Sequence, residues 1–310
     1  MDTLHQYLEE KKIEYSNEKE IAPFLTLGIG GKVEHIIIID TLEDLKALLS
    51  FMNTHNHPFV LLGGGSNVVF PDGFSPISVI INRTSQMVKY QSGHIIKVDS
   101  GVLNKDLLSW AITQRVGGLE FLAGIPGTVG GAAAVNAGSF GQSISMSLEK
   151  ATVFTPGSGD IKTVDRDYFQ FQYRNSIFKY GREVILEVFL TYVDLDSIEI
   201  REKVKEKVLY RKENHPPQNL HTAGCFFKNP IIGDKKISAG QLLEKSGFKN
   251  SIHHRLEVSG AHANFIINRG GGTFEEIQSL ERKIIETVHD KHGIHLEREV
   301  IYISPEGKKY

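Results

Sequence analysis

"FVLLGGGSNVVF", residues 59–70, places three consecutive glycines between two hydrophobic runs. A glycine triplet costs conformational entropy, so it indicates a backbone that another group must approach closely. Successive N–H groups without side chains form a concave anion site that suits phosphates. The segment lacks the lysine of a P-loop, and it lacks both the GxGxxG spacing and the following helix of a Rossmann site. The stretch therefore predicts a strand–loop–strand cradle formed by Gly63, Gly64, Gly65, Ser66 and Asn67.

A second glycine-rich segment, "GIPGTVGGAAAVNAGSFG", spans residues 124–141. Its small alanines, residues 132–134, allow close packing under a planar ring, and Asn136 and Ser139 add polar groups at its end. Either segment alone is read most simply as a tight turn with close packing. Both together favour one long ligand with a pyrophosphate middle and a flat end. The residues that predict a flat, stiffened backbone surface here are Gly124, Pro126, Gly127, Gly130 and Gly131.

The composition is that of an ordinary globular protein of one or two domains. The chain has 310 residues, of which 40% are hydrophobic and 23% charged. A net charge of −2 argues against a nucleic-acid partner. The single cysteine, Cys225, excludes an intrachain disulfide and fits a reducing compartment. With no signal peptide at the N-terminus and no apolar run long enough to span a bilayer, we expect a cytoplasmic protein without membrane contact.

Hydrophobic periodicity predicts a mixture of helices and strands without strict βαβ alternation, which favours an α+β fold. Capping signals support several helix starts: Thr41, Ser238 with Gln241, and Thr273 with Glu276. The expected strands are 32–40, 59–62, 68–70, 78–82, 94–101, 150–156 and 183–193. The expected helices are a polar surface helix within 1–19, then 41–56, 104–118 stopped by glycine, 197–214, one after Ser238 and one after Thr273.

Four motifs occur in order: "LGGGSNVV", "LEFLAGIPGTVGGAAAVNAGSFG", "YRNSIFK" and "AGCFFKNP". Together they resemble the UDP-N-acetylenolpyruvoylglucosamine reductase family over nearly the whole chain, from about residue 23 to 303. The resemblance implies an FAD-binding domain of the vanillyl-alcohol-oxidase (PCMH) type in two subdomains and a C-terminal α+β substrate-binding domain. We expect an N-terminal helical segment at 1–19, the FAD domain at 20–194 and the substrate domain at 195–310. The short segment between 194 and 222 is similar to the compact type of the family.

The same resemblance implies a noncovalent FAD, NADPH as reductant and a UDP-sugar substrate. The implied reaction reduces the enolpyruvyl ether of UDP-N-acetylglucosamine enolpyruvate to UDP-N-acetylmuramate for peptidoglycan synthesis. In this family NADPH docks where the sugar later binds, so no separate Rossmann domain is required. The implied FAD-binding residues are Gly63, Gly64, Gly65, Ser66, Asn67, Gly124, Ile125, Pro126, Gly127, Val129, Gly130, Asn136 and Gly138.

Three residues match the family's catalytic motifs. Arg174 is expected to hold the substrate carboxylate and stabilise an enediolate, because a guanidinium makes two parallel hydrogen bonds. Cys225 stands where most relatives carry a serine proton donor, and a thiol of pKa about 8.5 gives up a proton more readily than a hydroxyl. Glu299 matches the catalytic glutamate. Their plainer readings are a strand-bridging arginine, a small core cysteine and a solvated edge acid.

The resemblance also implies substrate contacts from Tyr173, Lys228, Asn229, His262 and Asn264. Lys228 reads equally well as a surface lysine and His262 as a core histidine. Because no histidine or cysteine spacing typical of a metal site occurs, we expect no structural or catalytic metal.

Two other functions remain open on the sequence. A flavin oxidase of the same superfamily, acting on a small alcohol or sugar, would keep the fold, although such enzymes often tether flavin through a histidine or cysteine that neither loop contains. A nucleotide-binding protein without catalysis would keep the loops, but the presence of all three catalytic candidates argues against it. The sequence does not determine the oligomeric state, and a monomer is favoured.

Overall fold

The computed structural model describes residues 3–90, 92–181 and 183–310, and the chain folds as two compact units. The first unit consists of Met1–Lys19, Glu34–Gly64 and Pro76–Tyr210. The second consists of Glu20–Val33, Gly65–Ser75 and Arg211–Tyr310. The second unit thus takes two short segments from the N-terminal part of the chain, which the predicted linear domains do not include. The predicted boundaries at 19 and 194 stay a prediction.

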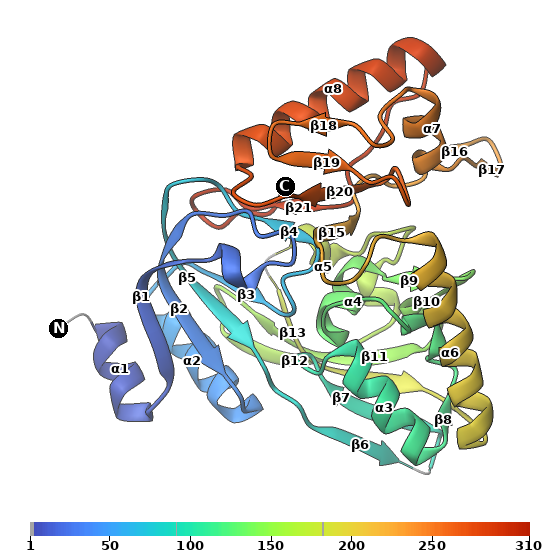
Figure 1. Ribbon diagram of the computed structural model, residues 1–310. Helices are drawn as coiled ribbons and strands as arrows, with labels where there is room; N and C mark the ends of the chain where they lie inside the picture. The colour runs from blue at the N-terminus through green and yellow to red at the C-terminus, as the bar shows by residue number, and fades with distance from the viewer. Residues whose placement is uncertain (1–2, 91, 182) are drawn as a thin grey trace. The chain divides into compact units, whose positions relative to one another are not determined.

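The first unit contains a four-stranded sheet in the order β1-β2-β5-β3, in which β3 and β5 are parallel (Figure 1). Helices α1 and α2 bury leucines in the same hydrophobic cluster as Ile37 and Ile39 of this sheet. The predicted cap is confirmed, since the Thr41 hydroxyl accepts the N–H of Asp44 at 3.1 Å. The elements are α1 (Thr3–Lys11), β1 (Glu14–Glu20), β2 (Lys32–Ile39), α2 (Leu42–Thr54), β3 (Phe59–Leu62) and β5 (Phe74–Asn82).

The prediction of one surface helix over 1–19 is wrong for its described part, while residues 1 and 2 lie outside the described residues. Helix α1 stops at Lys11, and Lys12 has a left-handed φ of 56°. The polar run that follows becomes the edge strand β1, because pairing with β2 outweighs its weak strand propensity. The helix is also no mere surface element, since Leu4 and Leu8 are fully buried.

A five-stranded antiparallel sheet, in the order β12-β11-β13-β7-β6, forms the rest of the first unit with its helices (Figure 1). The expected helix 197–214 is confirmed with those bounds. The elements are β6 (Met87–Tyr90), β7 (Ile95–Asp99), α3 (Asn104–Gln114), β8 (Val116–Gly117), α4 (Val129–Val135), β9 (Gly138–Ser139), β10 (Gln142–Ser143), β11 (Leu148–Thr155), β12 (Asp160–Asp165), α5 (Ile177–Tyr180), β13 (Val184–Thr191), β14 (Val193–Asp194) and α6 (Ser197–Asn214).

The predicted end of the helix that begins at residue 104 is corrected by the structure. Helix α3 stops at Gln114, and Arg115 takes the left-handed capping conformation with φ 56° while its N–H bonds to the carbonyl of Ala111. The glycine expected to stop the helix, Gly117, lies in the short strand β8, which pairs with β14.

The second unit has a four-stranded antiparallel sheet in the order β15-β20-β19-β18, and a parallel pair of β4 with β21. Its core is the apolar side of α7 and α8 packed with this sheet and with Leu27 and Ile29 from the N-terminal segment. The elements are β4 (Val68–Val69), β15 (His221–Cys225), β16 (Ile231–Ile232), β17 (Lys235–Lys236), α7 (Ala239–Lys245), β18 (Ile252–His253), β19 (Leu256–Val258), β20 (Phe265–Asn268), α8 (Phe274–His292) and β21 (Ile301–Tyr302).

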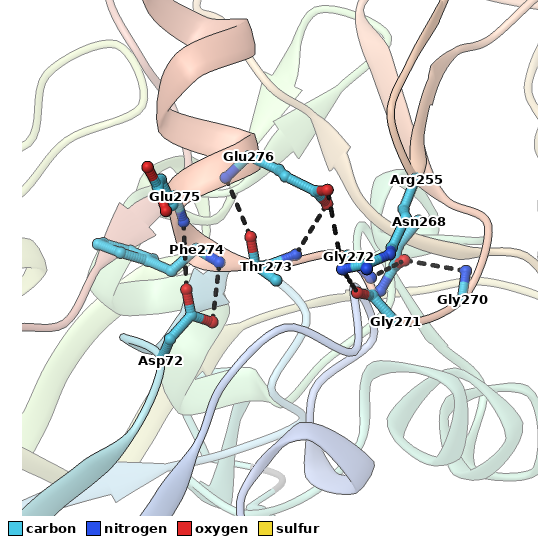
Figure 2. A network of polar contacts seen from close by, with 10 residues as sticks. All are labelled: Asp72, Arg255, Asn268, Gly270, Gly271, Gly272, Thr273, Phe274, Glu275 and Glu276. Carbon is cyan, nitrogen blue, oxygen red and sulfur yellow. Dashed lines mark hydrogen bonds and ion pairs between the residues drawn. The ribbon is translucent and has the colours of Figure 1, made fainter.

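The start of α8 is held by a network of side chains (Figure 2). Thr273 and Glu276 form the predicted capping box, each accepting the other's backbone N–H at 3.2 Å. The carboxylate of Asp72 accepts the N–H groups of Phe274 and Glu275 at 3.0 and 3.3 Å. Because unpaired N–H groups at a helix start favour negative charge, Asp72 anchors the segment that follows the glycine triplet to α8.

In the parts of the chain that the structure describes, none of the helices combines the length and the apolar character needed to cross a membrane.

Candidate active site

The two glycine segments lie against each other within the first unit. A Cβ atom on Gly63 would stand 2.3 Å from the Thr128 hydroxyl oxygen, and one on Gly64 would stand 2.6 Å from Cα of Gly127. Gly127 itself has a φ of 105°, which side chains rarely allow. The glycines are therefore required for the close approach of the two backbones, and this contact supports the prediction that they serve one ligand.

The remainder of the triplet belongs to the second unit. Gly65 has a φ of 58°, and a Cβ on it would stand 2.1 Å from the carbonyl oxygen of Phe24. Its own carbonyl accepts the N–H of Thr26 at 3.0 Å. The Asn67 side chain donates to the carbonyl of Glu299 at 3.3 Å, and the Asn67 carbonyl accepts the N–H of Ile301 at 3.0 Å. The loop is followed by β4, so strand–loop–strand is confirmed.

The second glycine segment is a short helix rather than a flat surface, which corrects the prediction. Thr128 caps α4 by accepting the N–H of Gly131 at 3.2 Å. Gly130 packs on the backbone of Ser100, whose carbonyl accepts its N–H at 2.9 Å, and a Cβ there would stand 2.5 Å from Cβ of Ser100. A run of glycine and alanine carries no hydrophobic periodicity, so the pattern gave no helix signal.

A cavity of about 320 Å³ opens beside these contacts in the first unit. The Asn104 side chain, 1% exposed, donates to the carbonyl of Ile125 at 3.2 Å, but its Oδ1 has no hydrogen-bond partner among the described residues. A buried acceptor of this kind indicates a group that the protein itself does not provide. The cavity is lined by Gly63, Ile81, Asn82, Arg83, Ser85, Met87, Gly101, Val102, Leu103, Asp106 and Thr128.

The cavity contains residues that the sequence analysis missed. Asn82 ends β5 and Arg83 follows it, and Gly101 and Leu103 lie between β7 and α3. Polar and glycine residues directly after buried strands were the signal available to find them. Of the predicted cofactor residues in this unit, Gly63 lines the cavity, and Gly64, Gly127 and Gly130 lie in the adjoining backbone contacts. Contacts of the predicted set with a cofactor stay a prediction.

Arg174 lies in a tight turn with a left-handed φ of 55°. Two backbone bonds between Gln172 and Asn175, at 3.0 and 3.2 Å, close the turn. The side-chain oxygen of Asn175 is buried without a hydrogen-bond partner among the described residues. Non-glycine residues in this conformation cost about 1–3 kcal/mol and occur often at functional sites. The guanidinium carbon stands 5.7 Å from the ring centre of Tyr173.

The Arg174 turn is fastened to the second glycine segment from both sides. The Asn136 amide donates to the carbonyl of Gln172 at 2.8 Å and accepts the N–H of Ser145 at 3.3 Å. The hydroxyl of Ser176 donates to the carbonyl of Ala134 at 2.6 Å. The first unit therefore brings Arg174 and the predicted flavin segment together. The side chains of Asn136 and Ser176 make the hydrogen bonds that join them.

In the second unit, Cys225 and Glu299 lie on hydrogen-bonded neighbouring segments. Cys225 is a half-buried thiol at the end of β15, next to Gly224, which has a φ of 78°. The carbonyl of the next residue, Phe226, accepts the N–H of Glu299 at 2.8 Å. The register between β15 and β20 shifts between Thr222 and Cys225, so the regular pairing of the strands is interrupted just before Cys225. This arrangement brings two predicted catalytic residues and Asn67 into one region of the unit.

The predicted substrate residues of the second unit flank this region. Lys228 is buried, and its ammonium group forms an ion pair with Glu297, a mostly exposed side chain. The Asn229 side chain accepts the N–H of Ala239 at 2.9 Å. Asn264 accepts the N–H of Phe227 at 3.0 Å and donates to the same residue's carbonyl at 2.8 Å. Asn264 therefore fixes the backbone after Cys225, and contact of these residues with a substrate stays a prediction.

His262 packs in an aromatic cluster with His215 and Phe265. Its ring centre is 5.4 Å from that of His215 and 5.1 Å from that of Phe265. Burial lowers the pKa of His262, and Lys249 adds to this. Burial also lowers the pKa of His215 to about 4, with smaller contributions from Arg211 and His262. Both imidazoles are therefore neutral near pH 7, as the interpretation of His262 as a core histidine predicts.

Arg174 and Tyr173 belong to the first unit, whereas Cys225, Lys228, Glu299 and the other predicted residues of the later motifs belong to the second. Each unit thus gathers its own part of the predicted set. Their meeting at one substrate stays a prediction.

Comparisons with known proteins assign a family to the chain. Residues 33–165 match the family model of the FAD binding domain, and residues 215–303 match that of the UDP-N-acetylenolpyruvoylglucosamine reductase C-terminal domain. The chain is 33% identical over 276 residues to UDP-N-acetylenolpyruvoylglucosamine reductase 2 of Bacillus anthracis, covering 88% of each chain. It is 35% identical over 291 residues to the reductase of Protochlamydia amoebophila, covering 94% of each.

A solved structure gives the same result. The UDP-N-acetylenolpyruvylglucosamine reductase (MurB) of Thermus caldophilus matches with a TM-score of 0.75 and 29% identity, over 94% of this chain and 98% of that one. The α+β architecture with an FAD-binding domain is thereby confirmed. Relatives above 30% identity that span most of both chains decide the classification. The chain belongs to the UDP-N-acetylenolpyruvoylglucosamine reductase family.

Proposed function

We propose that this chain catalyses the NADPH-dependent reduction of UDP-N-acetylglucosamine enolpyruvate to UDP-N-acetylmuramate in peptidoglycan synthesis. Family membership across 88–94% of the chain supports the reaction class, and the FAD-binding domain supports the cofactor. The observation that carries the proposal is the hydrogen bond from the Glu299 N–H to the carbonyl of Phe226, at 2.8 Å, which joins the backbone segment of Glu299 to the residue that follows Cys225.

The residues present fit FAD. Gly63 and Thr128 both line the cavity, and a Cβ on Gly63 would stand 2.3 Å from the Thr128 hydroxyl oxygen, so only glycine fits there. Asn104, whose buried Oδ1 has no hydrogen-bond partner among the described residues, directly follows the lining residue Leu103. FAD is held there by main-chain amides, without a covalent bond, because neither glycine segment contains a histidine or cysteine. When bound, FAD would accept a hydride from NADPH and pass it to the terminal vinyl carbon of the substrate.

Arg174 binds the carboxylate of the enolpyruvyl group. As hydride reaches the terminal carbon, negative charge moves to the adjoining carbon and its carboxylate, and the guanidinium fork stabilises that enediolate. The strained turn and its two anchors on α4 keep the fork in place before the substrate arrives. Removing such a contact typically costs about 2.7–4 kcal/mol of activation free energy.

Cys225 donates the proton that completes the product. The S–H bond breaks, a C–H bond forms at the carbon next to the ether oxygen, and the thiolate then takes a proton from water. Glu299 acts as the acid that hydrogen-bonds to the developing enediolate. Tyr173, Lys228, Asn229, His262 and Asn264 bind or shape the sugar and diphosphate part of the site. Because Lys228 is paired with Glu297, a substrate phosphate must displace or share that carboxylate.

The test is spectroscopic. Purified protein should be yellow, NADPH should bleach it under anaerobic conditions, and UDP-N-acetylglucosamine enolpyruvate should restore the colour. UDP-N-acetylglucosamine, which lacks the vinyl group, is the matched control and should leave the protein bleached. Flavin that is not bleached by NADPH, or colour restored by oxygen but not by the enolpyruvyl substrate, would favour the oxidase alternative.

The chain is further proposed to act in the cytoplasm as a monomer. Sedimentation of the pure protein tests the oligomeric state.

A further inference from the structure

We propose that the first unit carries a site for a divalent transition-metal ion, separate from the flavin site, formed by His5, His35 and Asn17. These residues line a cavity of about 370 Å³ together with Glu18 and Glu34. They come from three elements: His5 from α1, Asn17 and Glu18 from β1, and Glu34 and His35 from β2.

The donor atom of His5 already has the spacing of a cis ligand to each of the other two. Nε2 of His5 stands 3.2 Å from Nε2 of His35 and 3.0 Å from Oδ1 of Asn17. Metal–nitrogen bonds of about 2.0–2.1 Å, at tetrahedral or octahedral angles, place neighbouring ligands about 2.9–3.4 Å apart. The distances within the pair of His5 and His35, and within the pair of His5 and Asn17, therefore match those of ligands to one ion.

The surroundings orient His35 as a ligand. Its ring is buried, and its Nδ1 stands 3.1 Å from the hydroxyl of Ser78, so an Nδ1–H donated there leaves the Nε2 lone pair directed at His5. Metal-binding histidines usually hold their second nitrogen in this way. The His5 ring is stacked on Tyr15, with ring centres 5.4 Å apart. The carboxylates of Glu18 and Glu34 add negative charge around the cavity.

The ligand set selects the class of ion. Two imidazoles and one amide oxygen suit Zn²⁺, Ni²⁺ or Cu²⁺, whereas Mg²⁺ and Ca²⁺ prefer all-oxygen sites. The sequence predicts no metal because the ligands are spread over thirty residues without a recognised spacing. Among the described residues no group of three His, Cys, Asp or Glu side chains is arranged to hold a metal, so Asn17 and water must complete the coordination. In the metal-free protein, the His5 Nε2–H can donate to His35 Nε2 instead.

The test is isothermal titration of the untagged, flavin-loaded protein with ZnCl₂ at pH 7.5, with MgCl₂ as the ion control. We expect one zinc ion per chain and no heat from magnesium. His5→Gln replaces a partly exposed side chain of α1 and should weaken zinc binding at least tenfold. His35→Gln should weaken it to the same extent. The matched control is His57→Gln, a histidine of the same unit outside the proposed ligand set, whose ring lies beside those of Phe51 and His55.

Two further readouts make the outcome decisive. Zinc should raise the melting temperature of the parent and of His57→Gln, but not of His5→Gln, because an ion that binds only the folded state stabilises it. Flavin content should be equal in all variants. Absence of zinc binding, full binding by a folded His5→Gln, or loss of binding in His57→Gln would each overturn the proposal.

Discussion

The close contact of the two glycine segments makes Gly64→Ala a sharp perturbation. The new methyl carbon would stand 2.6 Å from Cα of Gly127, whereas two carbon atoms are at their optimum at about 3.5–4.0 Å. The two backbones must therefore separate by about 1 Å. Overpacking of this size costs about 1–3 kcal/mol. Because both segments must be in contact to hold one cofactor, we expect most of this cost to appear in FAD binding.

A loss of 1–3 kcal/mol corresponds to a dissociation constant for FAD that is about 5- to 150-fold higher. The assay is a titration of flavin-free protein with FAD, followed by flavin fluorescence, together with a thermal melt to show that the variant is folded. The matched control is Gly131→Ala in the same segment. Its methyl group would meet the Thr128 hydroxyl at 3.4 Å, an ordinary contact, and it adds a better helix former to α4.

The reasoning is refuted by a folded Gly64→Ala protein whose affinity for FAD stays within twofold of the parent. Equal losses in Gly64→Ala and Gly131→Ala would also contradict it, because the effect would then not depend on the contact with Gly127. A drop in melting temperature for Gly64→Ala without loss of affinity would show that the contact stabilises the unit and has no part in the cofactor site.

Three more predictions test the proposed chemistry and the buried histidine His215. Cys225→Ala should keep its flavin and lose turnover while Cys225→Ser retains measurable activity; an alanine variant that works at the parent's rate removes Cys225 as proton donor. Arg174→Lys should bind FAD normally but lower kcat about 10²–10³-fold, since an ammonium cannot reproduce the two parallel bonds, and unchanged kinetics place Arg174 outside the site. Burial lowers the pKa of His215 from 6.5 to about 4, so between these pH values the unfolded chain binds a proton that the folded chain does not. The contribution of the neutral His215 to the free energy of unfolding is therefore complete above about pH 6.5 and is lost as the pH falls towards 4. Urea unfolding at a series of pH values should show that the free energy of unfolding falls by about 2 kcal/mol over this range, after a discount for solvent screening, and by less in His215→Gln. An equal dependence of the free energy of unfolding on pH in both proteins would contradict the assignment.

Sequence reasoning succeeded where the chemistry is local. The cap of Thr41, the capping box of Thr273 and Glu276, and helix α6 each depend on residues within one or two turns, and each is confirmed. The strand–loop–strand form of the first glycine segment is local in the same sense. Motif order was sufficient for the family, because four motifs spread over the chain restrict the alternatives more than any single loop.

Several failures depend on contacts between residues distant in sequence, whereas the end of α3 at Gln114 and the helix α4 are local features that the sequence pattern did not signal. The run 14–20 is polar enough to read as helix, and only pairing with β2 makes it a strand. Gly64 and Gly127 show their purpose only when the two backbones are seen to touch. The cluster of His5, Asn17 and His35 is similarly invisible in the linear chain. The assembly of the second unit from three separate segments could not be predicted from composition shifts along the sequence.

That assembly has a consequence for biosynthesis. Strand β4 pairs in parallel with β21, so that Val68 lies opposite Ile301 and Val69 opposite Tyr302. A growing chain emerges from the ribosome at about 5–20 residues per second. The segment 65–75 must therefore wait for more than two hundred residues of further translation before its partner exists, with its apolar strand unprotected. We expect nascent chains that stop short of Tyr302 to expose this segment to chaperones and proteases, whereas the full chain pairs it with β21.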